Sequence, residues 1–221
     1  MALIDIVKWE QPGELLAWRF PNTGLTTAAP VFVNESQEAL LFRGGKLYDV
    51  LGPGAHTLTT ENIPILGKLV NLPFGGQSPF SAEVWFVNRA VTLDVNWGTP
   101  DPIQVEDPKY GIIVPVRAFG QLGMRVADAG AFVTKLVGAT QSFSRTELSS
   151  YFRGIVTARV KTAVATAIVR QGISILEISS KLQKLSEQVE SEIAPELRPF
   201  GVELIAFRVL SINVPEDDEW V

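Results

Sequence analysis

The sequence predicts an α+β fold, with a β-rich first part, two or three helices and a closing strand. Three observations lead to this prediction. Glycine and proline interrupt residues 1–120 at short intervals, and the runs between them are rich in valine, isoleucine, phenylalanine and tryptophan. From about residue 127 the apolar residues instead recur every three or four positions, which is typical of helices. Alternation returns in residues 202–214, after the Pro199-Phe200-Gly201 break.

Strands are expected where apolar and polar residues alternate between turn residues. The clearest example is 91–97, in which Val91, Leu93, Val95 and Trp97 should form a buried face and the residues between them an exposed one. The same pattern predicts further strands at 15–20, 30–34, 83–88, 112–118 and 121–126.

Residues 38–58 are expected to form a β-hairpin followed by a second turn. The hairpin strands, 38–42 and 47–51, flank Gly44-Gly45, and glycine readily adopts the positive φ angles that two-residue hairpin turns require. Pro53-Gly54 suits the central positions of a type II turn that leads to a strand starting at His56. A structural role is therefore assigned to the turn residues Gly44, Gly45, Pro53 and Gly54.

The helical part begins with a short predicted helix over 128–137, which should end near Gly138. Ser144-Arg145-Thr146-Glu147 has the form of a capping box, in which a serine hydroxyl and a glutamate carboxylate satisfy the free N–H groups of a helix start. It predicts a long helix that ends near Gly172.

A second long helix is expected over 180–197, with Pro195 ending or kinking its last turn. Its apolar residues form one narrow stripe: Leu182, Leu185, Val189, Ile193 and Leu197. The stripe either packs inside the domain, which is the favoured interpretation, or pairs with a neighbouring copy of the chain. Its first four residues are therefore candidate interaction residues.

Composition excludes several classes of protein and site. The 221 residues carry a net charge of −5 and a pI near 5.0, which argues against nucleic-acid binding. Because the chain has no cysteine, thiolate zinc sites and cysteine nucleophiles are excluded. No apolar run is long enough for a membrane span, and the first 20 residues lack a signal-peptide pattern.

The motifs that suggest catalysis are incomplete. Gly45-Lys46 is followed by leucine and lacks the upstream glycine that a phosphate-binding loop requires. His56 is the single histidine, and no G-x-S-x-G motif accompanies it, so it is interpreted as a strand residue. The acidic residues 216–219 are interpreted as a solvated tail. The sequence therefore predicts no enzymatic activity, metal, cofactor or small-molecule substrate.

Residues 72–80 contain two phenylalanines, two prolines and two glycines. This composition fits a binding loop with Phe74 and Phe80 as aromatic anchors. It also fits a rigid crossover whose phenylalanines fill the core, and this second interpretation is favoured.

Two segments resemble SPFH (band 7) domains, the family of stomatins, prohibitins and flotillins. In Glu38–Lys46 and Leu51–His56 a strand ending in Gly-Lys leads to a Pro-Gly-x-His turn, and Leu197–Leu204 is similar to the family's helix-to-strand junction. Further motifs are similar to bacterial SPFH proteins labelled "virion core protein" homologues. These motifs occupy 62–66, 72–76, 78–80, 83–88, 97–100 and 117–120.

The resemblance implies an SPFH fold with a curved antiparallel sheet in its β-rich part, 1–126, and helices with a closing strand in 127–215. It implies no zinc site, because this chain has no cysteines for the zinc ribbon that ends many relatives. The acidic tail 216–221 then ends either a truncated chain or a naturally short form. The N-terminal membrane anchor of stomatins and prohibitins is also lacking.

The function implied by the resemblance is that of a non-enzymatic scaffold. The chain is expected to form a homo-oligomer in a membrane-associated assembly, with a link to envelope stress. It would be cytoplasmic, held at the inner face of the membrane through a membrane-protein partner. The alternatives are a peptide- or lipid-binding module that uses Phe74 and Phe80, and a structural, virion core-like shell protein.

Overall fold

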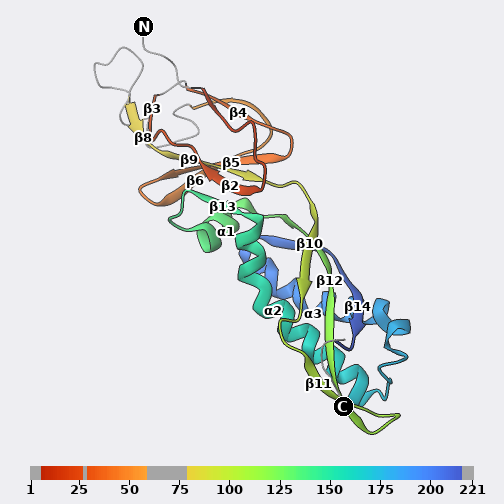
Figure 1. Cartoon of the computed structure of the whole chain (residues 1–221). Helices are drawn as coiled ribbons and strands as arrows, with labels where there is room; N and C mark the ends of the chain where they lie inside the picture. Colours follow the sequence, from red (N-terminus) through yellow and green to blue (C-terminus); the bar gives the residue numbers. More distant parts are fainter. Residues whose placement is uncertain (1–5, 27–28, 59–78, 216–221) are drawn as a thin grey trace. The chain divides into compact units, whose positions relative to one another are not determined.

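The computed structural model describes residues 6–26, 29–58 and 79–215, which belong to two compact units (Figure 1). The first unit combines Met1–Ala90 with Val126–Glu147, and the second combines Val91–Arg125 with Leu148–Val221. Each unit thus draws on both the β-rich and the helical parts of the sequence. The change of pattern near residue 127 marks the transition from strands to helices. It is not the boundary between the compact units, because each unit consists of two segments that are separate in the sequence.

The first unit is built around a five-stranded antiparallel sheet in the order β13-β2-β9-β5-β6. The predicted hairpin forms its β5-β6 edge, and the predicted strand at 83–88 forms β9 in the middle. The strands are β13 (Ser142–Ser144), β2 (Leu15–Arg19), β9 (Glu83–Asn88), β5 (Gln37–Arg43) and β6 (Lys46–Leu51).

Two smaller sheets complete the β structure of this unit. The predicted strand at 30–34 forms β4, which pairs in parallel with β1 and antiparallel with β7. The bounds are β1 (Val7–Lys8), β4 (Pro30–Val33) and β7 (Gly54–Thr57), with β3 (Gly24–Thr26) paired to β8 (Pro79–Ser81) in a separate ribbon.

The core of the first unit gathers side chains from the five-stranded and three-stranded sheets. Trp9, Trp18 and Phe86 pack together with ring centroids 6.0 to 6.5 Å apart. Residues 39–42 of β5 are all buried, because the core covers one face of this strand and helix α1 contacts it as well. A strand covered on both faces has a continuous apolar run rather than an alternating one.

The short predicted helix is α1 (Ala129–Phe132), extended by a wider π turn over Val133–Val137. Asp128 caps its start, since the carboxylate accepts a hydrogen bond from the Ala131 N–H at 2.9 Å. Gly138 ends it with a positive φ of 58°.

The second unit contains a sheet in which β12 (Ile112–Val126) pairs with three other strands. β10 (Thr92–Gly98) and β11 (Ile103–Asp107) are both antiparallel to it. Thr99 connects them on the same edge of β12: its N–H donates to the Ala118 carbonyl at 2.9 Å and its hydroxyl accepts from the Ala118 N–H at 3.1 Å. β14 (Val202–Asn213), the predicted closing strand, also pairs with β12.

The prediction of two strands at 112–118 and 121–126 was wrong in one respect, because β12 is continuous over 15 residues. Gly120 is an extended residue and makes no turn. A Cβ atom at this position would collide with the backbone oxygen of Arg208 and would lie 2.7 Å from the ring of Trp97. The glycine therefore serves close packing, since the Trp97 ring stacks on Phe207 at a centroid distance of 4.9 Å.

The predicted burial pattern of 91–97 was wrong for its first three residues, whereas Val95 and Trp97 are more buried than Asp94 and Asn96, as predicted. Val91 and Leu93 are 44% and 62% exposed, whereas Thr92 is only 6% exposed. The pairing of β10 with β12 changes register between Thr92 and Val95. A one-residue shift of register moves side chains to the opposite face of a sheet. The alternation in the sequence therefore predicted the wrong face for Thr92 and Leu93.

Both long helices are present. α2 (Arg145–Ala165) starts at the predicted capping box, in which the Glu147 carboxylate accepts from the Ser144 N–H at 2.6 Å and the Ser144 hydroxyl accepts from the Glu147 N–H at 3.2 Å. A π turn extends α2 to Arg170, and Gly172 follows with φ of 69°. α3 (Leu182–Leu197) lies between 3₁₀ turns at Ile178–Lys181 and Arg198–Phe200.

Candidate functional site

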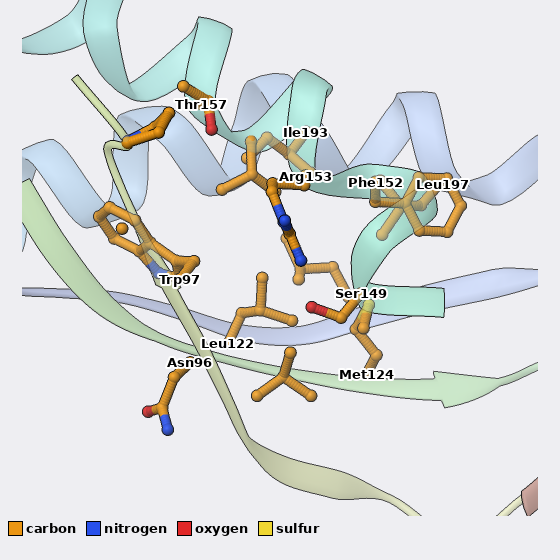
Figure 2. Close-up of a pocket in the computed structure, with 15 residues that line it drawn as sticks. Asn96, Trp97, Leu122, Met124, Ser149, Phe152, Arg153, Thr157, Ile193 and Leu197 are labelled. Atoms are coloured by element: carbon orange, nitrogen blue, oxygen red, sulfur yellow. The ribbon is translucent and has the colours of Figure 1, made fainter. Parts of the chain in front are cut away.

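The second unit contains a pocket of about 410 Å³ between its sheet and its two long helices (Figure 2). One wall is the sheet, through β10, β12 and β14, and the other is formed by α2 and α3. Most of its wall is apolar: Leu122 and Met124 of β12, Phe152 and Val156 of α2, and Ile193 and Leu197 of α3. Its volume lies within the range of small-molecule sites.

Polar groups enter the pocket from one line of α2. Ser149, Arg153 and Thr157 are spaced four residues apart, so their side chains follow one another along one face of the helix. Figure 2 shows the Arg153 guanidinium pointing into the middle of the pocket, on the side of the Ser149 hydroxyl. Arg153 is the one charged residue of the lining.

The charge of Arg153 is not neutralised by a neighbour. Within the described part of the chain it forms no ion pair, and its one hydrogen bond, to the Ser150 hydroxyl, is long at 3.4 Å. Arg159, six residues later, provides a contrast, because it donates to the Glu196 carboxylate at 2.6 and 2.8 Å. That hydrogen bond and the charge of Glu196 raise the pKa of Arg159.

The β10 side of the pocket is held in place by its neighbours. The Asn96 amide accepts a hydrogen bond from the Gln121 side chain at 3.2 Å, and Trp97 is fixed between Gly120 and Phe207. The tryptophan indole N–H is buried without a hydrogen-bond partner.

A second notable group is the carboxylate of Asp107, which is fully buried at the end of β11. One oxygen accepts from the N–H groups of Lys109 and Tyr110 at 2.9 and 3.2 Å. The other accepts from the Ser174 hydroxyl at 2.8 Å and the Ile175 N–H at 2.7 Å. Burial alone would raise the pKa of Asp107, but these hydrogen bonds, led by that from Ile175, hold the pKa below its ordinary value. The carboxylate therefore joins the β11–β12 turn to the loop before α3.

The opposite face of the sheet exposes apolar side chains. Along β12 and β14, buried residues that face the helices alternate with residues that face away from the helices. Several of the residues that face away are large and apolar. The outer face, as we name it, consists of Leu93, Phe119, Ile205 and Leu210, which are 62%, 47%, 37% and 48% exposed. Leu93 lies across Gly123, and the Arg125–Glu203 ion pair, at 2.6 Å, connects β12 to β14 beside it.

The predicted apolar stripe of α3 is mostly covered. Leu185, Val189 and Ile193 are each at most 4% exposed, α3 packs against β14, and Leu182 is half-buried at the helix start. Ile193 also lines the pocket. A second copy could reach this stripe only if α3 left β14, so the burial agrees with the interpretation of internal packing.

The other predicted site residues lie in the first unit or outside the described residues. Phe74 falls in the undescribed range 59–78; Phe80 is in β8, but its side chain is not described. Gly44 and Gly45 have φ angles of 55° and 75° in the β5–β6 turn. Gly54 has φ of 126°, which is wider than the value of about 80° in a type II turn.

Two features of the second unit, the polar side of the pocket and the buried Asp107, were not predicted from the sequence. Ser149, Arg153 and Thr157 are four residues apart on a helix that is otherwise apolar toward the core. This spacing could have predicted a polar line on one face of the helix. Asp107 had no such signal, because its partners Ser174 and Ile175 are distant in sequence and an aspartate before a turn is ordinarily exposed.

In residues 6–26, 29–58 and 79–215 no three metal-ligand side chains of the histidine, cysteine, aspartate or glutamate type come together. None of the helices described combines the length and apolar character that crossing a bilayer requires. His56 is a residue of β7, and its Nε2 bonds to the Gly52 carbonyl at 2.7 Å, across the turn that leads into this strand.

Comparison with known proteins gives two matches. A family model described as "SPFH domain-Band 7 family" matches residues 17–220. The chain is also 22% identical over 217 residues to an uncharacterized protein, YdjI, of Bacillus subtilis (strain 168). That alignment covers 97% of this chain but 66% of the relative, which is the longer protein.

Proposed function

We propose that this chain, which belongs to the SPFH domain-Band 7 family, is a non-enzymatic scaffold domain that self-associates. Members of this family are generally membrane-associated scaffolds and generally non-enzymatic. In the proposal, copies of the chain assemble at the inner face of a membrane, where a membrane-protein partner holds them. A role of the assembly in envelope stress stays a prediction from the resemblance.

The observation that carries self-association is the outer face of the second unit. Large apolar side chains exposed together on one face of a sheet are costly in water and are typical of interaction surfaces. Charged residues of both signs lie on the same strands, Arg117 and Arg125 on β12 and Glu203 and Arg208 on β14. An apolar centre with a charged rim is the usual composition of a protein–protein interface.

The test measures the mass of the assembly. Light scattering on the purified chain should give a mass above the 24.1 kDa of one copy, rising with protein concentration. Phe119→Asp and Leu210→Asp should each lower that mass, because a carboxylate in an apolar interface must be desolvated without a partner. The matched control is Val169→Asp, since Val169 is 57% exposed in the same unit but lies on a helical turn.

The proposal fails if the wild-type chain stays at 24.1 kDa at every concentration, or if Val169→Asp dissociates the assembly as strongly as the two outer-face variants. Membrane association is tested separately, by fractionating cells that express the native full-length protein. Recovery of the protein away from membranes in every condition would contradict that part of the proposal.

A further inference from the structure

We propose that the pocket of the second unit binds a single-chain amphiphile with a carboxylate head, of the fatty-acid type. The carboxylate would pair with Arg153, and the hydrocarbon chain would lie between Leu122 and Met124 of the sheet and Ile193 of α3. This ligand site is independent of the proposed scaffold function.

The head group follows from the charge of the lining. Arg153 is always protonated and presents a planar fork of donors, which suits the two oxygens of a carboxylate. No acidic residue lines the pocket, and no carboxylate elsewhere in the described residues pairs with Arg153. The hydroxyls of Ser149 and Thr157, one helical turn to either side, can complete the hydrogen bonding of an anion.

The hydrocarbon chain follows from the remaining wall. Met124, Phe152, Ile193 and Leu197 are among the residues that line the pocket, and all four are apolar, so the inner wall of the pocket is apolar. A volume of about 410 Å³ with charge on one side accommodates an elongated apolar body and one anionic end. A nucleotide or a sugar would leave its polar groups against this wall without partners, which is costly.

Methyl NMR offers a site-specific measurement. The chain has two methionines, Met1 and Met124, and Met124 lines the pocket. With ¹³C-methyl-labelled methionine, dodecanoate below its micellar concentration should shift the Met124 resonance in a saturable way. Met124→Leu identifies that resonance by removing it.

Arg153→Gln should weaken dodecanoate binding about tenfold or more, since it removes hydrogen bonds to a charged group. Dodecanol, which has the same chain without the charge, should bind wild type and Arg153→Gln equally, and this shows that the variant is folded. Arg170→Gln is the matched control, because Arg170 is an exposed arginine of the same unit outside the pocket. It should bind dodecanoate as wild type does.

Three results would overturn the proposal. The first is a Met124 resonance that does not respond to dodecanoate. The second is an Arg153→Gln variant that binds dodecanoate as tightly as Arg170→Gln. The third is a Met124 shift that phosphatidylglycerol vesicles produce at a lower lipid concentration than dodecanoate does, which would assign the anionic ligand to the bilayer instead of a single-chain molecule.

Discussion

At the scale of single residues, Asp107 shows how a buried charge can be kept in a fold. Four hydrogen bonds compensate for the water it has lost, and two come from residues more than 60 positions away. Because these bonds favour the ionised form, the pKa of Asp107 is lower in the folded state than in the unfolded chain, where it is about 3.9. Its contribution to stability is then present above the unfolded pKa and lost as the pH falls through the folded pKa.

We expect Asp107→Asn to lower the free energy of unfolding at pH 7, since the amide group replaces an acceptor with a donor that faces other donors. The difference from wild type should shrink as the pH falls below about 4, toward the folded pKa. Urea unfolding at pH 7 and at pH 3 measures it. Asp101→Asn, at an exposed position of the same unit, should change little at either pH. An equal loss of stability for Asp107→Asn at both pH values would contradict the assignment.

At the scale of elements, the most informative contact is that of α3 with the edge of β14. The Val209 N–H donates to the Ser186 hydroxyl at 2.9 Å, and the Phe207 N–H donates to the Glu190 carboxylate at 3.2 Å. An edge strand with free N–H groups is a template for unwanted pairing with other chains. Here side chains of the helix satisfy two of those groups, so α3 covers the strand both by apolar packing and by hydrogen bonds.

Ser186→Ala should destabilise the fold by about 1–3 kcal/mol, because the buried Val209 N–H would lose its acceptor. Denaturant unfolding gives this value, and hydrogen exchange at the Val209 amide should become faster. The control is Ser191→Ala on the exposed side of α3, where the hydroxyl donates only to the Gln188 carbonyl. Equal stabilities of the two variants would show that the Ser186–Val209 bond has no net effect.

At the scale of the whole molecule, the two compact units are made from interleaved segments. The chain leaves the first unit at Ala90, returns at Val126 and leaves again after Glu147. The sheet of the first unit needs β13, which pairs with β2, and the sheet of the second unit needs β14 and both long helices. Neither unit is therefore complete in the β-rich part of the sequence.

We expect a fragment of residues 1–126 to lack cooperative unfolding, because it would expose side chains that β13, α2 and α3 cover in the full chain. Buried residues of β12 such as Leu122 and Met124 are among them. Thermal unfolding followed by circular dichroism and the dispersion of amide resonances would show this. Mixing the fragment with residues 127–221 should restore both signals. A fragment 1–126 that unfolds cooperatively alone would instead support the division of the chain at residue 126.

Local chemistry in the sequence determined most of the elements. The capping box at Ser144, the glycines at 44 and 45, and the helix-period residues of α2 and α3 act over a few residues, so their conformations could be predicted without knowing the fold. The motifs of the hairpin and of the junction at Leu197–Leu204 were also local, and they led to the family.

Tertiary structure decided what local patterns do not contain. The register change in β10 exposed Leu93 and buried Thr92, the close contact at Gly120 made β12 continuous, and Asp107 met partners from a distant loop. The pocket also depends on tertiary structure, because α2 places Arg153 opposite the apolar residues of the sheet. Each of these depends on which strands and helices become neighbours, and a pattern of period two or 3.6 reports the face of an element but not what lies opposite it.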